Sequence, residues 1–491
     1  MASLFQANSR WAFVFCAGVC YNLCVDVSEA ARFDGRGRNG VESLALENGG
    51  GRKMFLGVYG CQMNVADAER MEGQLARLGF ERTEDMKAAD LILLVTCCVR
   101  ETAEDKVYGK IGEIKGLKRE KPSLIFGVAG CMAQKEGEAL IRRAPHIDFV
   151  LGTDRMAELG RIVSELLAER APHIVDVETT NAPLPEGVPV ARGGTVSAWV
   201  PIMYGCDNFC TYCIVPYVRG RERSRLPGDI LREIREAAAR GYREVTLLGQ
   251  NVNSYGKDHK KADFAELLMM ADEVEGIERV RYMTSHPKDL SERVIRAVKD
   301  GQHICEHFHL PVQHGSDAIL KAMNRRYTAE RYRELAARIR EEVPGASLTT
   351  DLIVGFPGET EADFEALLEF LRGIRFDAAY TFLYSKRSGT PAAQMPGEVP
   401  DEVKRQRLHR LMELQNGISL ARNLELAGKT VEVMAEGPSR TDEDTWTGRT
   451  RTNKIVLWPR RGTETPGALL PVRVTQPQTW VLKGEPAETI G

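Results

Sequence analysis

The chain has 491 residues, too many for one hydrophobic core, so about three domains are expected. Hydrophobic residues make up 43% and charged residues 27%, the composition of a soluble globular protein, and the absence of any apolar run of about 18 residues argues against a membrane span. The formal net charge of −3 argues mildly against a nucleic-acid partner, although a local basic surface can still bind phosphate.

The first 52 residues differ in character from the rest of the chain. Trp11–Cys20 is apolar, but only Arg10 precedes it and no clear A-x-A site follows, which disfavours a signal peptide. We therefore expect residues 1–52 to be a disordered or misassigned N-terminal extension, with Met54 close to the natural start. Three cysteines fall in this segment, where nothing predicts a folded site: Cys16, Cys20 and Cys24.

Residues 53–170 alternate between predicted strands and helices. The helices are expected at Val65–Leu78 and Arg100–Arg119, and the pattern is typical of a flavodoxin-like, doubly wound α/β domain. Ligands bind such sheets just beyond the carboxyl ends of the strands. Cys61, Cys97 and Cys131 each follow a predicted strand, so we expect the three thiols to converge on one edge. The predicted strands are Lys53–Tyr59, Ala89–Thr96, Ser123–Ala129 and Ile147–Leu151.

Residues 171–196 are predicted to be a linker, because Thr179–Thr195 is rich in proline, glycine and alanine. Strand and helix patterns alternate again over residues 197–424, which predicts a partial or full (β/α) barrel with its chemistry at the carboxyl ends of the strands. The strands are expected at Ser197–Met203, Glu244–Leu248, Arg279–Thr284, His307–Pro311, Ser347–Val354 and Ala378–Leu383.

Residues 425–487 predict a small β-barrel, because short strands alternate there with turns. The same region contains a basic run with Trp446 beside it, a combination that suits base stacking and phosphate contact, although a packed tryptophan with solvated arginines is the competing interpretation. The strands are expected at Thr430–Ala435, Thr445–Thr450, Lys454–Trp458, Leu469–Val474 and Thr479–Leu482.

Six of the 11 cysteines lie in glycine- or threonine-flanked motifs, which favours reduced metal-ligand thiols in the cytoplasm over secreted disulfides. Cys206, Cys210 and Cys213 follow the first barrel strand with the spacing C-x₃-C-x₂-C. Three thiolates on one loop can hold three corners of a [4Fe–4S] cluster and leave one iron open for a reacting ligand. A zinc site or unrelated thiols are the alternatives, but no fourth cysteine or histidine follows nearby.

This loop resembles the radical S-adenosylmethionine superfamily, in which the open iron binds S-adenosylmethionine and its cleavage gives a 5′-deoxyadenosyl radical. The N-terminal motifs Tyr59–Asn64, Thr96–Cys97 and Gly130–Gln134 resemble the methylthiotransferase family, whose first domain holds a second three-cysteine cluster. Thr-Cys in that pattern aligns with Cys97, which leaves Cys98 as a small buried hydrophobe.

The resemblance covers Met54 to about Leu482 and implies a C-terminal TRAM domain, a small RNA-binding module. His314 departs from it, because serine is expected there and Gln-His resembles the ribosomal-protein branch. Further matching stretches are Gly205–Pro216, Arg219–Arg225, Leu248–Tyr255, Thr284–Pro287, Leu310–Gln313 and Thr350–Thr360.

The family resemblance implies an enzyme that transfers a methylthio group to C2 of N6-(dimethylallyl)adenosine just 3′ of the anticodon, at position 37 of tRNA. The C2 hydrogen is not acidic, so general acid–base catalysis, worth roughly 10²–10⁴-fold, cannot remove it, whereas a carbon radical can. One cluster would make the radical and the other would carry the transferred sulfur. Methylthiolation of a ribosomal-protein aspartate, and a non-catalytic iron–sulfur regulator that binds RNA, are the alternatives.

The resemblance also implies cofactors and partners: two [4Fe–4S] clusters, S-adenosylmethionine, the tRNA anticodon stem-loop, and an electron donor such as flavodoxin or ferredoxin. We expect a monomer without membrane attachment. By analogy, the residues that bind S-adenosylmethionine are Gln250, Asn251, Ser285, Gln313, Ile353 and Gly355. The predicted RNA-binding residues are Arg219, Arg221, Arg223, Arg225, Trp446, Arg449, Arg451 and Lys454.

Overall fold

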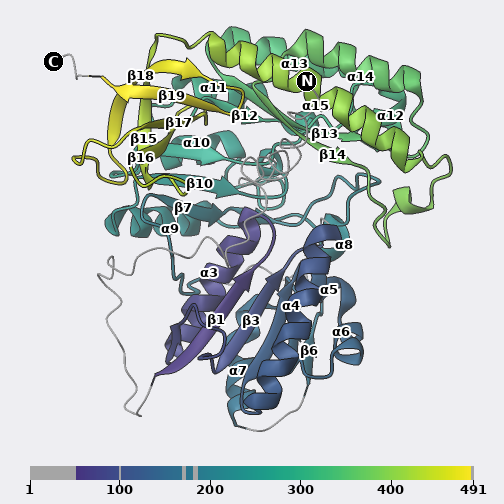
Figure 1. The fold of residues 1–491 in the computed structure, drawn as a ribbon, viewed down its shortest axis with the longest axis vertical. Helices are drawn as coiled ribbons and strands as arrows, with labels where there is room; N and C mark the ends of the chain where they lie inside the picture. The colour runs from purple at the N-terminus through teal and green to yellow at the C-terminus, as the bar shows by residue number, and fades with distance from the viewer. Residues whose placement is uncertain (1–50, 99–100, 169–172, 181–185, 488–491) are drawn as a thin grey trace, which may run out of the picture. The chain divides into compact units, whose positions relative to one another are not determined.

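The structure, a computed structural model, describes residues 51–98, 101–168, 173–180 and 186–487. The chain forms two compact units (Figure 1). The N-terminal unit ends at Gly193 but also includes Ile214–Arg221, and the C-terminal unit contains Gly194–Cys213 and the chain from Glu222 onward. Within the described residues, no helix has the length and apolar character needed to cross a bilayer. Apart from residues 51 and 52, the predicted N-terminal extension with its three cysteines lies outside the described residues.

The N-terminal unit contains a six-stranded parallel sheet with the order β2-β1-β3-β4-β5-β6, and the predicted doubly wound fold is confirmed. The central strands β3 and β4 are buried along their whole length, as their uninterrupted apolar sequences require. Two short strands were not predicted, and β6 lies inside the expected linker. The strands are β1 (Arg52–Val58), β2 (Phe80–Arg82), β3 (Leu91–Thr96), β4 (Ile125–Gly130), β5 (Phe149–Leu151) and β6 (Ile174–Asp176).

Helices cover both faces of this sheet (Figure 1). One face packs against α3 (Gln62–Arg77) and α7 (Leu159–Leu167), which follows the short 3₁₀ turn η2 (Met156–Glu158). The other face packs against α4 (Glu101–Glu120), α5 (Cys131–Glu136), α6 (Glu138–Arg143) and α8 (Val215–Arg219). Helix α8 comes from the middle of the predicted central domain, yet Ile214 and Val218 are buried in the N-terminal core.

The C-terminal unit begins with a partial (β/α) barrel of six parallel strands in two three-stranded sheets, β11-β10-β7 and β12-β13-β14. A single bridge between Val280 and Ile304 connects the two sheets. A small antiparallel pair, β8 (Met203–Tyr204) with β9 (Arg223–Ser224), flanks the cysteine loop. The barrel strands are β7 (Ser197–Pro201), β10 (Glu244–Leu248), β11 (Arg279–Tyr282), β12 (His307–His309), β13 (Ser347–Val354) and β14 (Ala378–Leu383).

Amphipathic helices surround these strands and bury their apolar faces in one core. Their starts are fixed locally, for example by the capping boxes of Asp263 with Glu266 and Thr360 with Asp363. The helices are α9 (Pro227–Ala239), α10 (Phe264–Asp272), α11 (Glu292–Asp300), α12 (Asp317–Ala322), α13 (Ala329–Glu342), α14 (Glu361–Ile374) and α15 (Asp401–Leu424). Short 3₁₀ turns are η3 (Val252–Ser254), η4 (Pro287–Asp289) and η5 (Pro391–Gln394).

The last strands form the predicted small barrel, closed in the order β15-β16-β17-β19-β18. Two tryptophans, Trp446 and Trp458, fill its centre with ring centroids 6.4 Å apart. The strands are β15 (Thr430–Pro438), β16 (Thr445–Thr450), β17 (Ile455–Pro459), β18 (Leu469–Pro477) and β19 (Val481–Pro486).

Candidate iron–sulfur and S-adenosylmethionine sites

The three N-terminal cysteines lie together at the carboxyl edge of the six-stranded sheet. Cys61 follows β1, Cys97 follows β3 and Cys131 follows β4, and these strands are neighbours in the sheet. The glycines before two of the cysteines are required by space. A Cβ on Gly60 would lie 2.6 Å from the Cβ of Cys97, and a Cβ on Gly130 would lie 2.6 Å from the carbonyl oxygen of Thr96. Both glycines also have a positive φ, so other residues would be strained there.

The electrostatic surroundings of these thiols differ. Burial raises the pKa of Cys61, while the nearby Arg219 guanidinium and two backbone N–H groups at the start of α3 oppose that effect. A hydrogen bond from Cys98 lowers the pKa of Cys131 to about 6, with Arg219 acting in the same direction. The same hydrogen bond, together with burial, raises the pKa of Cys98. Cys98 is thus buried as expected, but it serves as a thiol donor to Cys131.

Sequence reasoning did not identify the group that holds Arg219 beside these thiols. Arg219 Nη2 donates to Oδ1 of Asn64 at 2.8 Å and to Oδ2 of Asp67 at 2.9 Å, and all three side chains are buried. Asn64 Nδ2 in turn donates to the carbonyls of Tyr59 and Thr96, at the ends of β1 and β3. Asn64 was visible in the Cys61 motif, but nothing in the sequence connected it to a residue 155 positions later.

The second cysteine set occupies one loop of the C-terminal unit. Thr211 fastens the loop to the end of α12, because its backbone N–H and hydroxyl donate to the carbonyls of Met323 and Ala322. Asn324 adds bonds to the carbonyls of Asn208 and Phe209, which supports the left-handed backbone of Phe209 with φ 48°. The loop therefore presents its three thiols from a rigid backbone. These are Cys206, Cys210 and Cys213.

A buried arginine also accompanies this set. Arg325 Nη1 lies 3.3 Å from the sulfur of Cys210 and 3.3 Å from the hydroxyl of Tyr212. The Asn208 amide lies 3.5 Å from the sulfur of Cys206, whose pKa is raised to about 11 by burial. Arg325 was not among the predicted site residues, although it follows Met323 and Asn324 in the segment that holds the loop.

Two of the residues predicted to bind S-adenosylmethionine carry buried oxygen atoms without a hydrogen-bond partner. Gln250 Oε1 lies just after β10, and Ser285 Oγ lies just after the neighbouring β11. Thr284 and Gln313, at the same ends of the strands, have φ values of 70° and 75°, which non-glycine residues rarely adopt. Orphaned polar atoms and strained backbone both favour a ligand site at these carboxyl ends.

The remaining predicted residues are used within the protein. Both groups of the Asn251 amide are occupied, by Asp289 at 2.8 Å and by the backbone N–H of His286 at 3.0 Å. Ile353 N–H donates to the carbonyl of Gln313. Gly355 was expected to admit a ligand close to its backbone, but a Cβ there would lie 2.3 Å from Cγ of Lys404. The expected role of Gly355 is therefore wrong, because the space beside its backbone is filled by the Lys404 side chain.

His314, where the sequence departs from the expected serine, is fully buried. Its Nδ1 accepts from the Ser316 N–H at 3.0 Å, and its Nε2 lies 3.6 Å from the carboxylate of Glu359. His314 is therefore a residue of the protein core.

The alternating arginines after the cysteine loop do not form the expected exposed basic row. Arg219 is buried in the N-terminal unit as described above. Arg225 belongs to the C-terminal unit and is buried between Glu233 and the carbonyl of Pro201, both at 2.7 Å. Buried, paired guanidinium groups are not available to phosphate, so the prediction that Arg219 and Arg225 bind RNA is wrong. Arg221 is exposed and Arg223 is half-buried, and their role stays a prediction.

The residues predicted to bind RNA in the small barrel contact other parts of the protein, and RNA binding by the half-buried Arg449, Arg451 and Lys454 stays a prediction. Trp446 is packed in the barrel core. Arg449 pairs with Glu436 at 2.9 Å. Arg451 contacts Glu306 through three hydrogen bonds of 2.6–3.0 Å, and Lys454 donates to Asp377 at 3.0 Å and to Asn423 at 2.9 Å.

These contacts attach the small barrel to the amino-terminal face of the (β/α) barrel, opposite the cysteine loop. The turn between β16 and β17 is held there by two buried arginines at the start of β11. Arg279 donates to the carbonyl of Arg449 at 2.5 Å, and Arg281 donates to the carbonyls of Thr450 and Arg451 at 2.8 and 2.9 Å. These basic residues therefore connect the small barrel to the (β/α) barrel within the C-terminal unit.

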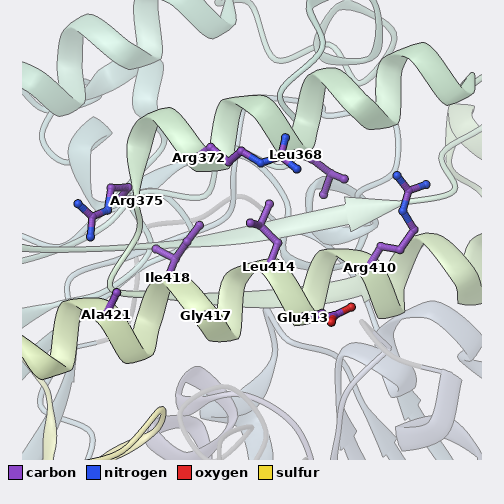
Figure 2. Close-up of a pocket in the computed structure, with 9 residues that line it drawn as sticks. All are labelled: Leu368, Arg372, Arg375, Arg410, Glu413, Leu414, Gly417, Ile418 and Ala421. Atoms are coloured by element: carbon purple, nitrogen blue, oxygen red, sulfur yellow. The ribbon is translucent and has the colours of Figure 1, made fainter.

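An open groove of about 550 Å³ lies between α14 and α15 (Figure 2). Its floor is apolar and its arginines are paired, for example Arg410 with Glu361 at 2.6 Å and Arg372 with Glu369 at 3.3 Å. None of the predicted site residues lines it. The lining residues are Leu368, Arg372, Arg375, Arg410, Glu413, Leu414, Gly417, Ile418 and Ala421.

The donor sets fit the cofactors that the sequence implies. Each unit brings three thiols together next to a buried arginine, which compensates part of the negative charge of thiolates. The described residues contain no group of three or more histidine, cysteine or carboxylate side chains close enough for a single metal ion, and a four-iron cluster is a larger object than one ion. The orphaned oxygens of Gln250 and Ser285 fit a polar ligand such as S-adenosylmethionine.

Comparisons with known proteins agree with this division. Residues 53–152 match the model of the uncharacterized protein family UPF0004, and residues 200–371 match that of the radical SAM superfamily. The tRNA-2-methylthio-N(6)-dimethylallyladenosine synthase of Carboxydothermus hydrogenoformans is 53% identical over 436 residues, covering 88% of this chain and 99% of the relative. The enzyme of the same name from Moorella thermoacetica is 52% identical, with 88% and 98% covered.

A solved structure shares the fold. It is the radical S-adenosylmethionine methyltransferase TsrM from Kitasatospora setae with cobalamin and a [4Fe-4S] cluster bound, with a TM-score of 0.52 and 15% identity over 70% of this chain and 77% of that chain.

Proposed function

Because the chain belongs to the family of tRNA-2-methylthio-N(6)-dimethylallyladenosine synthases, we propose that it transfers a methylthio group to C2 of N6-(dimethylallyl)adenosine at position 37 of tRNA. The enzyme uses two [4Fe–4S] clusters and S-adenosylmethionine. The main support for the proposal is the placement of one three-cysteine set in each unit. The chain is also about half identical to these synthases over most of its length.

The chain's own residues bind and orient. When bound, the radical cluster and S-adenosylmethionine supply a carbon radical that acid–base side chains cannot replace. Cys206, Cys210 and Cys213 would hold that cluster, while Gln250 and Ser285 offer hydrogen-bond acceptors to the cofactor. A buried site keeps water away from reactive groups and fixes their orientation.

Cys61, Cys97 and Cys131 would hold the second cluster, which carries the sulfur to be transferred. The target base must be unstacked to reach a radical, and this costs least in the single-stranded anticodon loop.

We also propose an electron donor, a location and an oligomeric state for the enzyme. A one-electron donor of the flavodoxin or ferredoxin type would reduce the radical cluster, and the use of six cysteines as metal ligands favours a cytoplasmic location. We propose that the chain acts as a monomer. Light scattering of the reconstituted protein would test the last point, and a dimer would contradict it.

The function is tested by anaerobic reconstitution, iron counting and nucleoside analysis of tRNA incubated with S-adenosylmethionine and a reductant. We expect 2-methylthio product only on prenylated tRNA. Cys206→Ala should abolish cleavage of S-adenosylmethionine, whereas Cys61→Ala should spare cleavage and prevent sulfur insertion. Cys305→Ala is the matched control, because Cys305 is a buried cysteine outside both sets.

Two outcomes would contradict the proposal. Unchanged 2-methylthio nucleosides in tRNA from cells lacking the gene would exclude the substrate. Equal loss of cleavage in Cys206→Ala and Cys61→Ala would exclude the division of labour between the cysteine sets. Modification of a ribosomal-protein aspartate, the alternative drawn from His314, is not favoured, because the relatives compared above are named for tRNA.

A further inference from the structure

Arg219, which the sequence analysis predicted to bind RNA, lies beside Cys61 and Cys131 in the structure. The residue closes α8, the helix that the N-terminal unit takes from the middle of the chain. Its side chain is only 3% exposed, and Asp67, its ion-pair partner at 2.9 Å, is 1% exposed. A buried ion pair of this kind is costly to desolvate, so its net contribution to fold stability is small.

The two ends of the guanidinium group have different surroundings. Nη2 is saturated, because it donates both to Asn64 and to Asp67. Nη1 is buried and has no hydrogen-bond partner. A buried charged donor without an acceptor is rare, because it forfeits the hydrogen bonds it had in water. Besides Asp67, the acidic groups that interact with the Arg219 guanidinium are the thiols of Cys131 and Cys61, so the unsatisfied donor belongs to the three-thiol site.

We propose that Arg219 is a positioning residue of the N-terminal iron–sulfur site, in which Nη1 donates a hydrogen bond to a sulfur atom of the bound cluster and Asp67 with Asn64 holds it in place. This inference rests on the proposed function. Hydrogen bonds to cluster sulfurs and nearby positive charge raise the reduction potential of an iron–sulfur cluster. Arg219 would thereby make the sulfur-carrying cluster easier to reduce and less negative.

Because Arg219 and Asp67 carry opposite charges, replacements of the two should shift the reduction potential of the N-terminal cluster in opposite directions. Arg219→Met removes a positive charge and a donor, so the potential should fall, while Asp67→Asn removes a negative charge and should raise the potential. Arg219→Lys keeps the charge and should restore most of the potential. Loss of one charge-assisted hydrogen bond is expected to change the reduction equilibrium about tenfold, which is about 59 mV for one electron.

The measurement uses the full chain with Cys206, Cys210 and Cys213 replaced by alanine, so that only the N-terminal cluster is present. Potentiometric titration followed by electron paramagnetic resonance gives its midpoint, and iron counting gives its occupancy. Arg225→Met is the matched control, because it removes another buried, paired arginine, in the C-terminal unit. Neither readout involves tRNA, so failure of this inference is distinguishable from failure of the proposed function.

A lower potential in Arg219→Met, restored by lysine and not reproduced by Arg225→Met, would support the inference. If Arg219 serves only to fasten α8, then Arg219→Met and Asp67→Asn will lower occupancy alike, and whatever cluster remains will have the original potential. That result would overturn it. If the methionine variant retains no cluster at all, Asp67→Asn decides the question, because a raised potential supports the inference and the original potential overturns it.

Discussion

Replacement of Arg451 by methionine should loosen the small C-terminal barrel. Arg451 donates to the carboxylate of Glu306 and to the carbonyls of Gln302 and Ile304 at 3.0 and 2.7 Å. Hydrogen bonds that involve a charged group contribute about 1.5–3 kcal/mol each, but this pair keeps 24% and 27% of its exposure, which reduces the gain. We expect a loss of about 2–3 kcal/mol, which corresponds to about 30- to 150-fold more frequent opening.

Hydrogen exchange followed by mass spectrometry measures this opening directly. Amides of β16 and β17 should exchange faster in Arg451→Met, whereas Arg460→Met, an exposed arginine of the same barrel, should change stability by no more than about 0.5 kcal/mol. Equal exchange in the two variants would refute the reasoning. Normal exchange with weaker and less salt-dependent RNA binding would instead restore Arg451 as a phosphate contact.

Trp446→Ala should destabilise the small barrel by about 3–5 kcal/mol in urea unfolding without changing the salt dependence of RNA binding, because the indole is a core residue. Ser285→Ala and Gln250→Leu should each weaken S-adenosylmethionine binding about tenfold in equilibrium dialysis at unchanged Tm; a lower Tm with unchanged affinity would contradict this. Cys131, with its pKa lowered to about 6, should stabilise the cluster-free fold most above about pH 9, and this contribution should be lost as pH falls toward 6. Cys98→Ala should flatten that pH dependence of the free energy of unfolding, and an unchanged profile would exclude the Cys98 hydrogen bond as its cause.

The long strands and the strand-end cysteines were predictable, because apolar runs and motif spacing are local properties of the sequence. Ser347–Val354 begins and ends as expected, and Cys61, Cys97 and Cys131 lie at one sheet edge because parallel strands share their direction. The arginines were not predictable in this way. Arg219 and Arg451 look like surface charges in sequence, and only the tertiary fold brings them to Asp67 and to Glu306.

Short elements were lost for a related reason. β6 has three residues and a half-buried pattern, so only its pairing with β5 makes it a strand. The role of Gly355 was misjudged because its neighbour Lys404 is on a helix 49 positions later, which no local pattern reveals.

Helix α8 has a consequence for how the protein is made and divided. Ile214 and Val218 complete a core whose other fully buried residues all precede Leu151, and among the residues that the structure describes, Arg219 is the cation that pairs with Asp67. When synthesis has reached Gly193, the N-terminal unit therefore still lacks part of its hydrophobic core and the arginine that pairs with Asp67. Cutting the gene at the linker would leave the same gap, so this first domain cannot be exchanged as a cassette unless the eight-residue segment 214–221 travels with it.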